Sequence, residues 1–149
     1  MKKIRIIVLS VLLLLCAAAS VYFCSRQEYK MVERTFFFPE PVSKTLKTEY
    51  RLLPVQDTLE KNLELMVKEV FLGPSLLTLD RVFPDGARLN HIFLRDGILY
   101  IDMNSRAAMS DSMFWLTFPE SLDILEKTLR KNYNGIDRIV FTVNGSIPE

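Results

Sequence analysis

The sequence predicts an α+β protein: a two-layer sandwich in which a mixed sheet carries two helices on one face, after an N-terminal membrane or signal helix. Two segments, 59–71 and 122–133, repeat apolar residues at helical spacing. The segments around them have the residue types of strands, and an Asp-Gly turn joins two of these strands. Each helix must bury its apolar stripe, and one face of the sheet can cover both.

The length and composition allow one compact domain together with a membrane or export segment. The chain has 149 residues, of which 25% are charged and 49% hydrophobic, as in ordinary globular proteins. Without Lys2, Lys3 and Arg5, 16 basic and 18 acidic residues remain, for a net charge of −2. This mildly acidic balance excludes the basic footprint of a nucleic-acid-binding protein. The composition also excludes collagen-like, coiled-coil, disulfide-scaffold and fully disordered classes.

Residues 1–24 have the pattern of a signal peptide or an N-terminal membrane anchor. Three basic residues precede an apolar stretch over 6–24. Small residues up to Ala19 would allow cleavage there. Without cleavage, the stretch would span about 28 Å as a helix, close to the ~30 Å hydrocarbon core, and the positive-inside rule would keep its N-terminus in the cytoplasm. Either alternative, a single-pass membrane protein or an exported one, places the rest of the chain outside the cytoplasm.

A third alternative, acylation of Cys24 in a lipoprotein, conflicts with the bulky Tyr22 and Phe23 that precede it. The chain has two cysteines, Cys16 and Cys24, and both lie in the N-terminal segment. The exported part therefore has neither an intramolecular disulfide nor a thiolate metal site. Residues 25–33 alternate in charge without an apolar face, and we expect a tether there.

Two short strands open the domain, which we place at 34–145 ahead of a tail at 146–149. The first strand covers 35–38 and the second covers 46–53, and a proline follows each of them. A further candidate strand covers 76–82.

The first helix, whose apolar stripe covers 59–71, has a start signal and a stop signal. Asp57 is the expected N-cap, and Glu60 follows it at the spacing of a capping box. Gly73 is placed for a C-terminal turn, and Pro74 prevents the helix from continuing.

The Asp96-Gly97 pair predicts a β-hairpin over 89–103, because this dipeptide favours the tight turn that joins two strands. The two-residue loop also sets the register. One face then gathers the apolar residues that we expect under the helices: Ile92, Leu94, Leu99 and Ile101. The other face holds two cross-strand pairs, Phe93 with Tyr100 and His91 with Asp102.

The second helix begins near Pro119, a favoured first helical residue, and ends before Gly135. Its apolar stripe consists of Leu122, Leu125, Leu129 and Tyr133. A final strand covers 136–143 and ends at the Asn144-Gly145 turn.

Several short motifs follow one another along the domain. They are Phe71-Leu72-Gly73-Pro74, Phe83-Pro84-Asp85-Gly86, Asp96-Gly97, Tyr100-Ile101-Asp102-Met103-Asn104, Ser121 to Leu129 and Arg138 to Gly145. In this order and spacing they resemble the GerMN domain, a family named for a sporulation and spore-germination protein. The resemblance covers about residues 34–145, and this chain carries one copy of the domain.

The resemblance implies an extracytoplasmic, membrane-tethered binding or assembly module without catalytic residues. GerMN domains are similar in fold to ring-building motifs of secretion and sporulation complexes, whose sheet and helix surfaces mediate oligomer contacts. The partners that it implies are an envelope protein or a second copy of the chain, with the membrane reached through residues 6–24.

The residues give little support to catalysis or metal binding. His91 is the only histidine, so histidines and cysteines cannot build a metal cluster in the domain. Asp102 is a candidate functional carboxylate, but a general acid–base pair needs a second group, and the spacing supplies none. The chain lacks the motifs of serine hydrolases, phosphate-binding loops and zinc proteases. We expect no catalytic, cofactor-binding or metal-binding residue.

Two features are candidate partner-binding sites. Residues 107–118 are apolar and aromatic without a clear period, so they either plug the edge of the core or expose a patch at Met113, Phe114 and Trp115. A basic cluster near the end of the second helix is either a solvated face or a contact for anionic lipid or an acidic partner. This cluster consists of Lys127, Arg130 and Lys131.

The sequence thus predicts a non-enzymatic interaction module at the outer face of a bacterial membrane, in a cell-envelope or sporulation and germination complex. The alternative is an exported domain that binds a small ligand or a glycan. A concave pocket with converging polar groups would favour that alternative.

Overall fold

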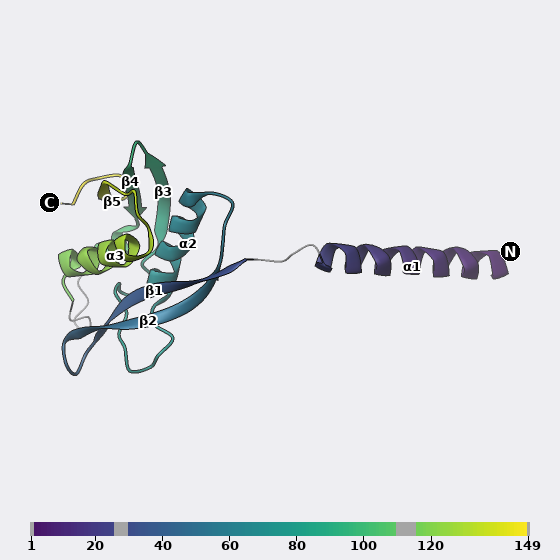
Figure 1. Cartoon of the computed structure of the whole chain (residues 1–149), viewed down its shortest axis with the longest axis horizontal. Coiled ribbons are helices and arrows are strands. Elements are labelled where there is room, and N and C mark those ends of the chain that lie inside the picture. Colours follow the sequence, from purple (N-terminus) through teal and green to yellow (C-terminus); the bar gives the residue numbers. More distant parts are fainter. Residues whose placement is uncertain (1, 26–29, 110–115, 149) are drawn as a thin grey trace. The chain divides into compact units, whose positions relative to one another are not determined.

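The structure is a computed structural model that describes residues 2–25, 30–109 and 116–148 (Figure 1). The chain divides into two compact units, Met1–Lys30 and Met31–Glu149. The first unit contains helix α1 (Lys2–Ser25). Within α1, the 21 residues Lys3–Phe23 are long and apolar enough to cross a membrane. At 1.5 Å per residue they span about 32 Å, close to the thickness of a hydrocarbon core.

The second unit is an α+β domain with two sheets. Its elements are β1 (Met31–Glu40), β2 (Thr45–Pro54), α2 (Leu59–Leu72), β3 (Leu89–Arg95), β4 (Ile98–Met103), the 3-10 helix η1 (Ser105–Ala108), α3 (Phe118–Asn132) and β5 (Arg138–Val143). Strands β1 and β2 pair with each other in an antiparallel hairpin. The other sheet has the order β3-β4-β5, with β4 antiparallel to β3 and parallel to β5.

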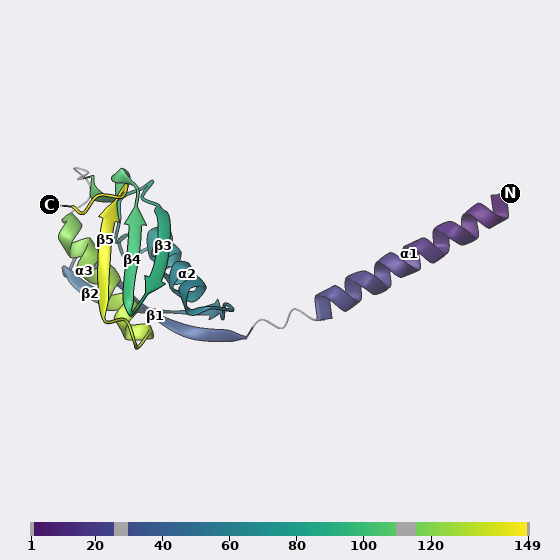
Figure 2. The same ribbon diagram turned by 90° about the horizontal axis from the view of Figure 1, so that it is seen from above.

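Helices α2 and α3 cover one face of the three-stranded sheet (Figure 2). This confirms the predicted fold class, including the mixed sheet with two helices on one face. The first two strands do not join that sheet. They lie on the other side of the helices (Figure 1), where Phe36, Phe38 and Leu53 are buried in the common core.

Strand β1 is longer than expected at both ends. It begins at Met31, inside the predicted tether, and it continues through Pro39. The carbonyl of Pro39 accepts a hydrogen bond from Asp80 N at 2.8 Å. The backbone polar groups of Pro39 therefore point away from β2. Proline is tolerated at this position because pairing with β2 requires no N–H group from it.

The candidate strand over 76–82 is wrong. This segment forms turns, and Leu79 N donates to Leu76 O at 3.1 Å. Leu76 and Leu77 are exposed, whereas Leu79 and Val82 are buried. The apolar residues therefore do not form a single buried face, which a strand on the core would need.

Both helices begin at a threonine N-cap. The cap of α2 is Thr58, one residue after the predicted Asp57, and its side chain accepts from Lys61 N at 3.2 Å. Helix α3 has a complete capping box between Thr117 and Glu120, which sequence analysis did not identify. Gly73 ends α2 with a φ of 87°, and its N–H donates to Val70 O.

The β3–β4 hairpin has the predicted register. Asp96 and Gly97 have φ values of 50° and 76°, as a tight turn of this kind requires. Both expected cross-strand pairs, Phe93 with Tyr100 and His91 with Asp102, are present, and the register becomes irregular only between Leu89 and His91. On the outer face, the Phe93 and Tyr100 rings stack at 4.6 Å between centroids.

Candidate binding groove

Three of the short motifs meet around a groove between the end of α2 and the segment that leads into β3. The groove has a volume of about 550 Å³ and is lined by Lys68, Phe71, Leu72, Arg81, Gly86, Ala87, Arg88 and Leu89. Phe71 and Leu72 come from the first motif, and Gly86 comes from the second. The third motif supports the groove from behind through Asn104.

The floor of the groove is apolar and packed on the core. The ring centroids of Phe71 and Phe83 lie 4.7 Å apart, so the first residues of these two motifs pack against each other. Ala87 is buried and Leu89 is partly buried. Leu72, in contrast, is 66% exposed at the rim. A ligand in the groove would therefore cover apolar surface that now contacts water.

The wall at 85–88 is held by side chains from the segment after β4. Asn104 Oδ1 accepts from Arg88 N at 3.0 Å, and Asn104 Nδ2 donates to Gly86 O at 2.9 Å. Arg106 Nε donates to Asp85 O at 3.0 Å. These bonds fix the backbone of the wall, so a ligand would meet a preformed surface and would lose less entropy in ordering it.

Gly73 makes room for one side of the groove. Its positive φ is strained for residues with a side chain, and a Cβ at this position would lie 2.8 Å from Arg81 Cγ. Arg81 therefore packs over the glycine where α2 ends. The Gly-Pro of the first motif thus ends the helix and also sets the position of a lining residue.

The lining contains three basic side chains and no acidic one among the residues that the structure describes. Lys68 Nζ is 2.6 Å from Glu64 Oε1, and Arg81 Nη1 is 2.8 Å from Asp85 Oδ1. Both pairs are solvent-exposed, and such pairs contribute only about 0–1 kcal/mol to stability. An incoming anion can therefore replace either carboxylate at small cost.

The groove continues along β3. A second hollow of about 230 Å³ is lined by Glu64, Lys68, Leu89, Asn90, His91 and Ile92. The two cavities share Lys68 and Leu89. We call the two together the α2–β3 trough.

On the outer face of the three-stranded sheet, hydrogen bonds within the domain hold Asp102 in place. This carboxylate accepts hydrogen bonds from Asn90 Nδ2 at 2.9 Å, Thr142 Oγ1 at 2.7 Å and Gly145 N at 2.7 Å. Burial raises the pKa of Asp102, but these hydrogen bonds and nearby His91 together hold the pKa below its usual value. Asp102 thus stays ionised and fastens the turn after β5.

A second charged cluster joins the β1–β2 hairpin to the end of α2. Arg51 Nε lies 2.6 Å from Glu49 Oε1, and Arg51 Nη1 lies 2.8 Å from Glu69 Oε2. Arg51 Nη2 donates to Gly73 O at 2.7 Å, and Glu49 also accepts from Ser75 N. Burial raises the pKa of Glu49, but Arg51 and the N–H groups of Ser75 and Leu76 outweigh it and lower the pKa. This cluster therefore binds two layers of the domain together.

The predicted partner-binding residues do not come together in one described site. Arg130 is engaged within the domain, since its Nε donates to Glu126 Oε1 at 2.6 Å and its Nη1 to Ile136 O at 2.7 Å. Lys131 is exposed near the end of α3. The patch at Met113, Phe114 and Trp115 lies outside the described residues.

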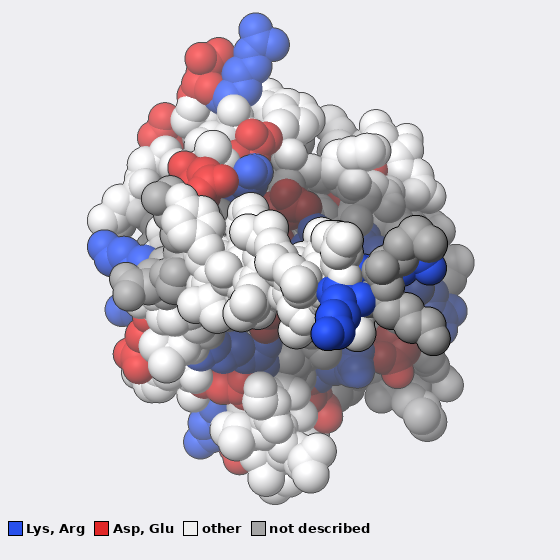
Figure 3. Space-filling model, turned by 90° about the vertical axis from the view of Figure 1, so that its right-hand side faces the viewer, with Lys and Arg blue, Asp and Glu red and all other residues white. Residues whose placement is uncertain are grey.

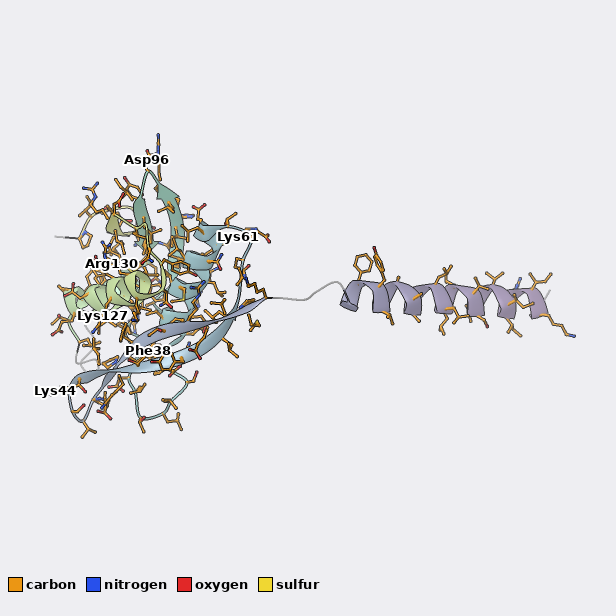
Figure 4. All side chains as sticks on the ribbon, viewed as in Figure 1. Phe38, Lys44, Lys61, Asp96, Lys127 and Arg130 are labelled. Atoms are coloured by element: carbon orange, nitrogen blue, oxygen red, sulfur yellow. The ribbon has the colours of Figure 1, made fainter. Side chains whose placement is uncertain are left out.

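Figure 3 shows Lys and Arg interspersed with Asp and Glu on the side that it displays. In Figure 4, Lys127 and Arg130 lie on α3, and Lys61 lies at the start of α2. Lys127 Nζ lies 4.6 Å from the centroid of the Phe37 ring. In the described ranges, no group of three or more His, Cys, Asp or Glu side chains could hold a metal ion.

The groove was not predicted from the sequence, because the cations that line it are far apart along the chain. Lys68, Arg81 and Arg88 share no spacing pattern. The glycine and asparagine positions of the motifs could have indicated the groove, since Gly73, Gly86 and Asn104 all support it.

Comparison with known proteins agrees with the fold. Residues 20–148 match the family described as "Germane: Sporulation and spore germination". Among curated proteins, none matches the chain.

Three solved structures have the same fold. The tandem GerMN domains of the sporulation protein GerM from Bacillus subtilis are 18% identical with a TM-score of 0.56, covering 78% of this chain and 40% of that chain. The first GerMN domain of GerM is 17% identical with a TM-score of 0.55, covering 78% and 86%. A putative lipoprotein from Clostridium perfringens is 17% identical with a TM-score of 0.50, covering 78% and 76%. This chain thus spans 40% of the tandem structure.

Proposed function

This chain belongs to the Germane family of sporulation and spore germination, and from this premise we propose that it is a non-enzymatic interaction module. In this proposal α1 holds the domain at the outer face of a bacterial membrane. The domain contributes to a cell-envelope or sporulation-type complex by binding a partner protein in the α2–β3 trough.

The observation that carries the proposal is the convergence of the motifs on a preformed groove. Phe71, Gly86 and Asn104 belong to three motifs, and they build the floor and one wall of the same cavity. An apolar floor with a polar rim has the anatomy of a protein interface. The candidate functional carboxylate, Asp102, accepts three hydrogen bonds within the domain, which supports a structural role for it in this proposal.

The length and composition of α1 support the membrane tether. Its 21-residue apolar span suits the thickness of a bilayer. Lys2, Lys3 and Arg5 at its start favour a cytoplasmic N-terminus, which places the domain outside. A cleaved signal peptide would export the domain to the same side of the membrane.

Crosslinking of the full-length protein in its native membrane tests the proposal. We expect adducts with one recurrent envelope protein, or a ladder of multiples of the chain mass. Leu72→Asp, at the rim of the groove, should remove these adducts. Leu77→Asp is the matched control, because Leu77 is fully exposed on a turn and does not line the trough. A wild-type protein that gives no adduct with several linkers would contradict the proposal.

The size of the groove favours a second candidate function, the binding of a small exported ligand. Its volume of about 550 Å³ falls within the range of ligand sites, about 300–1,000 Å³. A small ligand should raise the melting temperature of the wild-type protein and of Leu77→Asp, but not that of Leu72→Asp. If wild-type adducts are absent while such a shift is found, the second function replaces the first.

A further inference from the structure

We propose that the α2–β3 trough binds an extended, acidic segment of a partner protein, which adds as a new strand to the free edge of β3. This inference rests on the proposed function and specifies the chemistry of the partner. Three features of the trough support it: the open strand edge, the apolar floor and a lining in which Lys68, Arg81 and Arg88 outnumber one described acidic residue, Glu64.

The hairpin geometry shows which backbone groups of β3 point outward. In a two-residue hairpin the residues that flank the turn, Arg95 and Ile98, hydrogen-bond to each other. The pattern alternates along the regular part of the ladder, up to the irregularity between Leu89 and His91, so the backbones of Ile92 and Leu94 face away from β4. Within the part of the chain that the structure describes, the outward backbone groups of Ile92 and Leu94 form no hydrogen bond. Strand β3 thus presents a short row of donors and acceptors at the edge of its sheet.

The outer edge of β1, in contrast to that of β3, has hydrogen-bond partners within the domain. Thr35 hydrogen-bonds to the side chain of Asn132, Phe37 N donates to Thr128 Oγ1, and Pro39 O accepts from Asp80 N. Side chains and a turn therefore close this edge, which is how proteins commonly prevent unwanted strand pairing. The same domain leaves the β3 edge open where it borders the trough.

The lining selects the side chains of an added strand. Alternate residues of a strand point to the same face, so every second side chain of the partner would face the trough. An apolar side chain fits over Phe71 and Leu89. Acidic side chains two residues before and after it would meet three cations: Lys68 on α2, and Arg81 and Arg88 in the segment before β3. Strand addition then supplies affinity through backbone hydrogen bonds, and the lining supplies selectivity.

Peptide binding to full-length protein in phosphatidylcholine nanodiscs tests the inference. The probe is a fluorescent peptide in which every second residue is, in turn, glutamate, valine and glutamate, with threonine between them, so that one face presents both kinds of side chain. The charge control has lysine in place of each glutamate. We expect the acidic peptide to bind at least tenfold more tightly. Peptide binding should also slow amide hydrogen exchange at Ile92 and Leu94. Equal binding of the two peptides, or binding of neither, would overturn the inference.

A peptide methylated on its strand-facing amides separates strand addition from simple charge attraction. It retains the carboxylates but loses the hydrogen bonds to β3, so we expect at least tenfold weaker binding. Equal affinity of the methylated peptide contradicts strand addition. Displacement of the acidic peptide by phosphatidylglycerol vesicles would point to a lipid headgroup as the ligand, and it too would overturn the inference.

Charge reversal locates the binding site. Arg88→Glu should weaken binding of the acidic peptide at least tenfold, and Arg88→Lys should retain most of it. Arg138→Glu, an equal charge change at an exposed residue of β5, should leave binding unchanged. Equal losses in the two charge-reversal variants would mean that overall charge, not the trough, attracts the peptide.

The proposed function and this inference can fail separately. If wild-type protein forms partner adducts in its native membrane but binds no acidic peptide, the proposed function stands and the inference is wrong. If the acidic peptide binds as described but the membrane yields no adducts, the site exists and the proposed function is wrong.

Discussion

The side-chain amide of Asn132 pairs with the backbone of Thr35 in both directions. Asn132 Oδ1 accepts from Thr35 N at 2.9 Å, and Asn132 Nδ2 donates to Thr35 O at 2.6 Å. One side chain near the end of α3 thus takes the place that a neighbouring strand would have beside β1. This contact closes the edge of β1 and joins the hairpin to the rest of the domain.

Replacing Asn132 by Ala should destabilise the domain by about 1–3 kcal/mol, because it leaves partly buried backbone groups without partners. Urea unfolding of the wild type and the variant measures this difference. Lys131→Ala is the control at the neighbouring exposed position, and it should change the free energy of unfolding by less than about 0.5 kcal/mol. Similar effects for the two substitutions would show that the Asn132 contact is unimportant for stability.

The observed cap of α2 predicts different effects at adjacent positions. Thr58→Ala removes the side-chain oxygen that accepts from Lys61 N, and it should cost about 1 kcal/mol of stability. Asp57→Ala should cost less, because the Asp57 side chain makes only an exposed ion pair with Lys61. Thermal unfolding of both variants tests this order. The reverse order would make Asp57 the cap.

Two glycine substitutions separate backbone strain from the shape of the groove. Gly73 and Gly135 both have positive φ, so an alanine at either position should cost about 1–3 kcal/mol of stability. A Cβ at residue 73 would also press on Arg81, whereas at residue 135 it meets no atom within 4 Å. We therefore expect Gly73→Ala, but not Gly135→Ala, to weaken binding of the acidic peptide. Equal binding by the two variants would exclude a role for Arg81.

The lowered pKa values of Glu49 and Asp102 predict loss of stability in acid. A carboxyl group whose pKa is lower in the folded state stabilises the fold fully above its unfolded pKa. That contribution is lost as the pH falls from the unfolded pKa, about 4, through the lower folded value. Glu49→Gln and Asp102→Asn should therefore be less stable than the wild type at neutral pH, with the differences shrinking in acid. Urea unfolding over this pH range checks the trend, and differences that stay constant with pH would contradict it.

Local signals were sufficient to predict several elements of the fold. The span of α2 follows from its apolar period and from Gly73, and the β3–β4 register follows from the Asp96-Gly97 turn. In each case the determining residues lie within a few positions of the element. Local residue preferences then favour one conformation for the segment over others.

Features that depend on distant contacts were not predictable in this way. The extension of β1 to Met31 depends on pairing with Pro54, and its edge is closed by Asn132 from the other end of the domain. The basic lining of the groove combines α2 with the segment before β3, so no spacing in the sequence shows it. The separate β1–β2 sheet likewise depends on how both sides of the helices are covered.

Site-specific photo-crosslinking from position 72 tests the central claim, that the α2–β3 trough is the interaction surface of a membrane-tethered module. A photoreactive residue would replace Leu72 in the full-length protein in its native membrane, with Leu77 as the exposed control position. We expect one recurrent partner adduct from position 72, which is lost in the Arg88→Glu background, and no such adduct from position 77. Adducts from position 77 alone, or none from position 72, would contradict it.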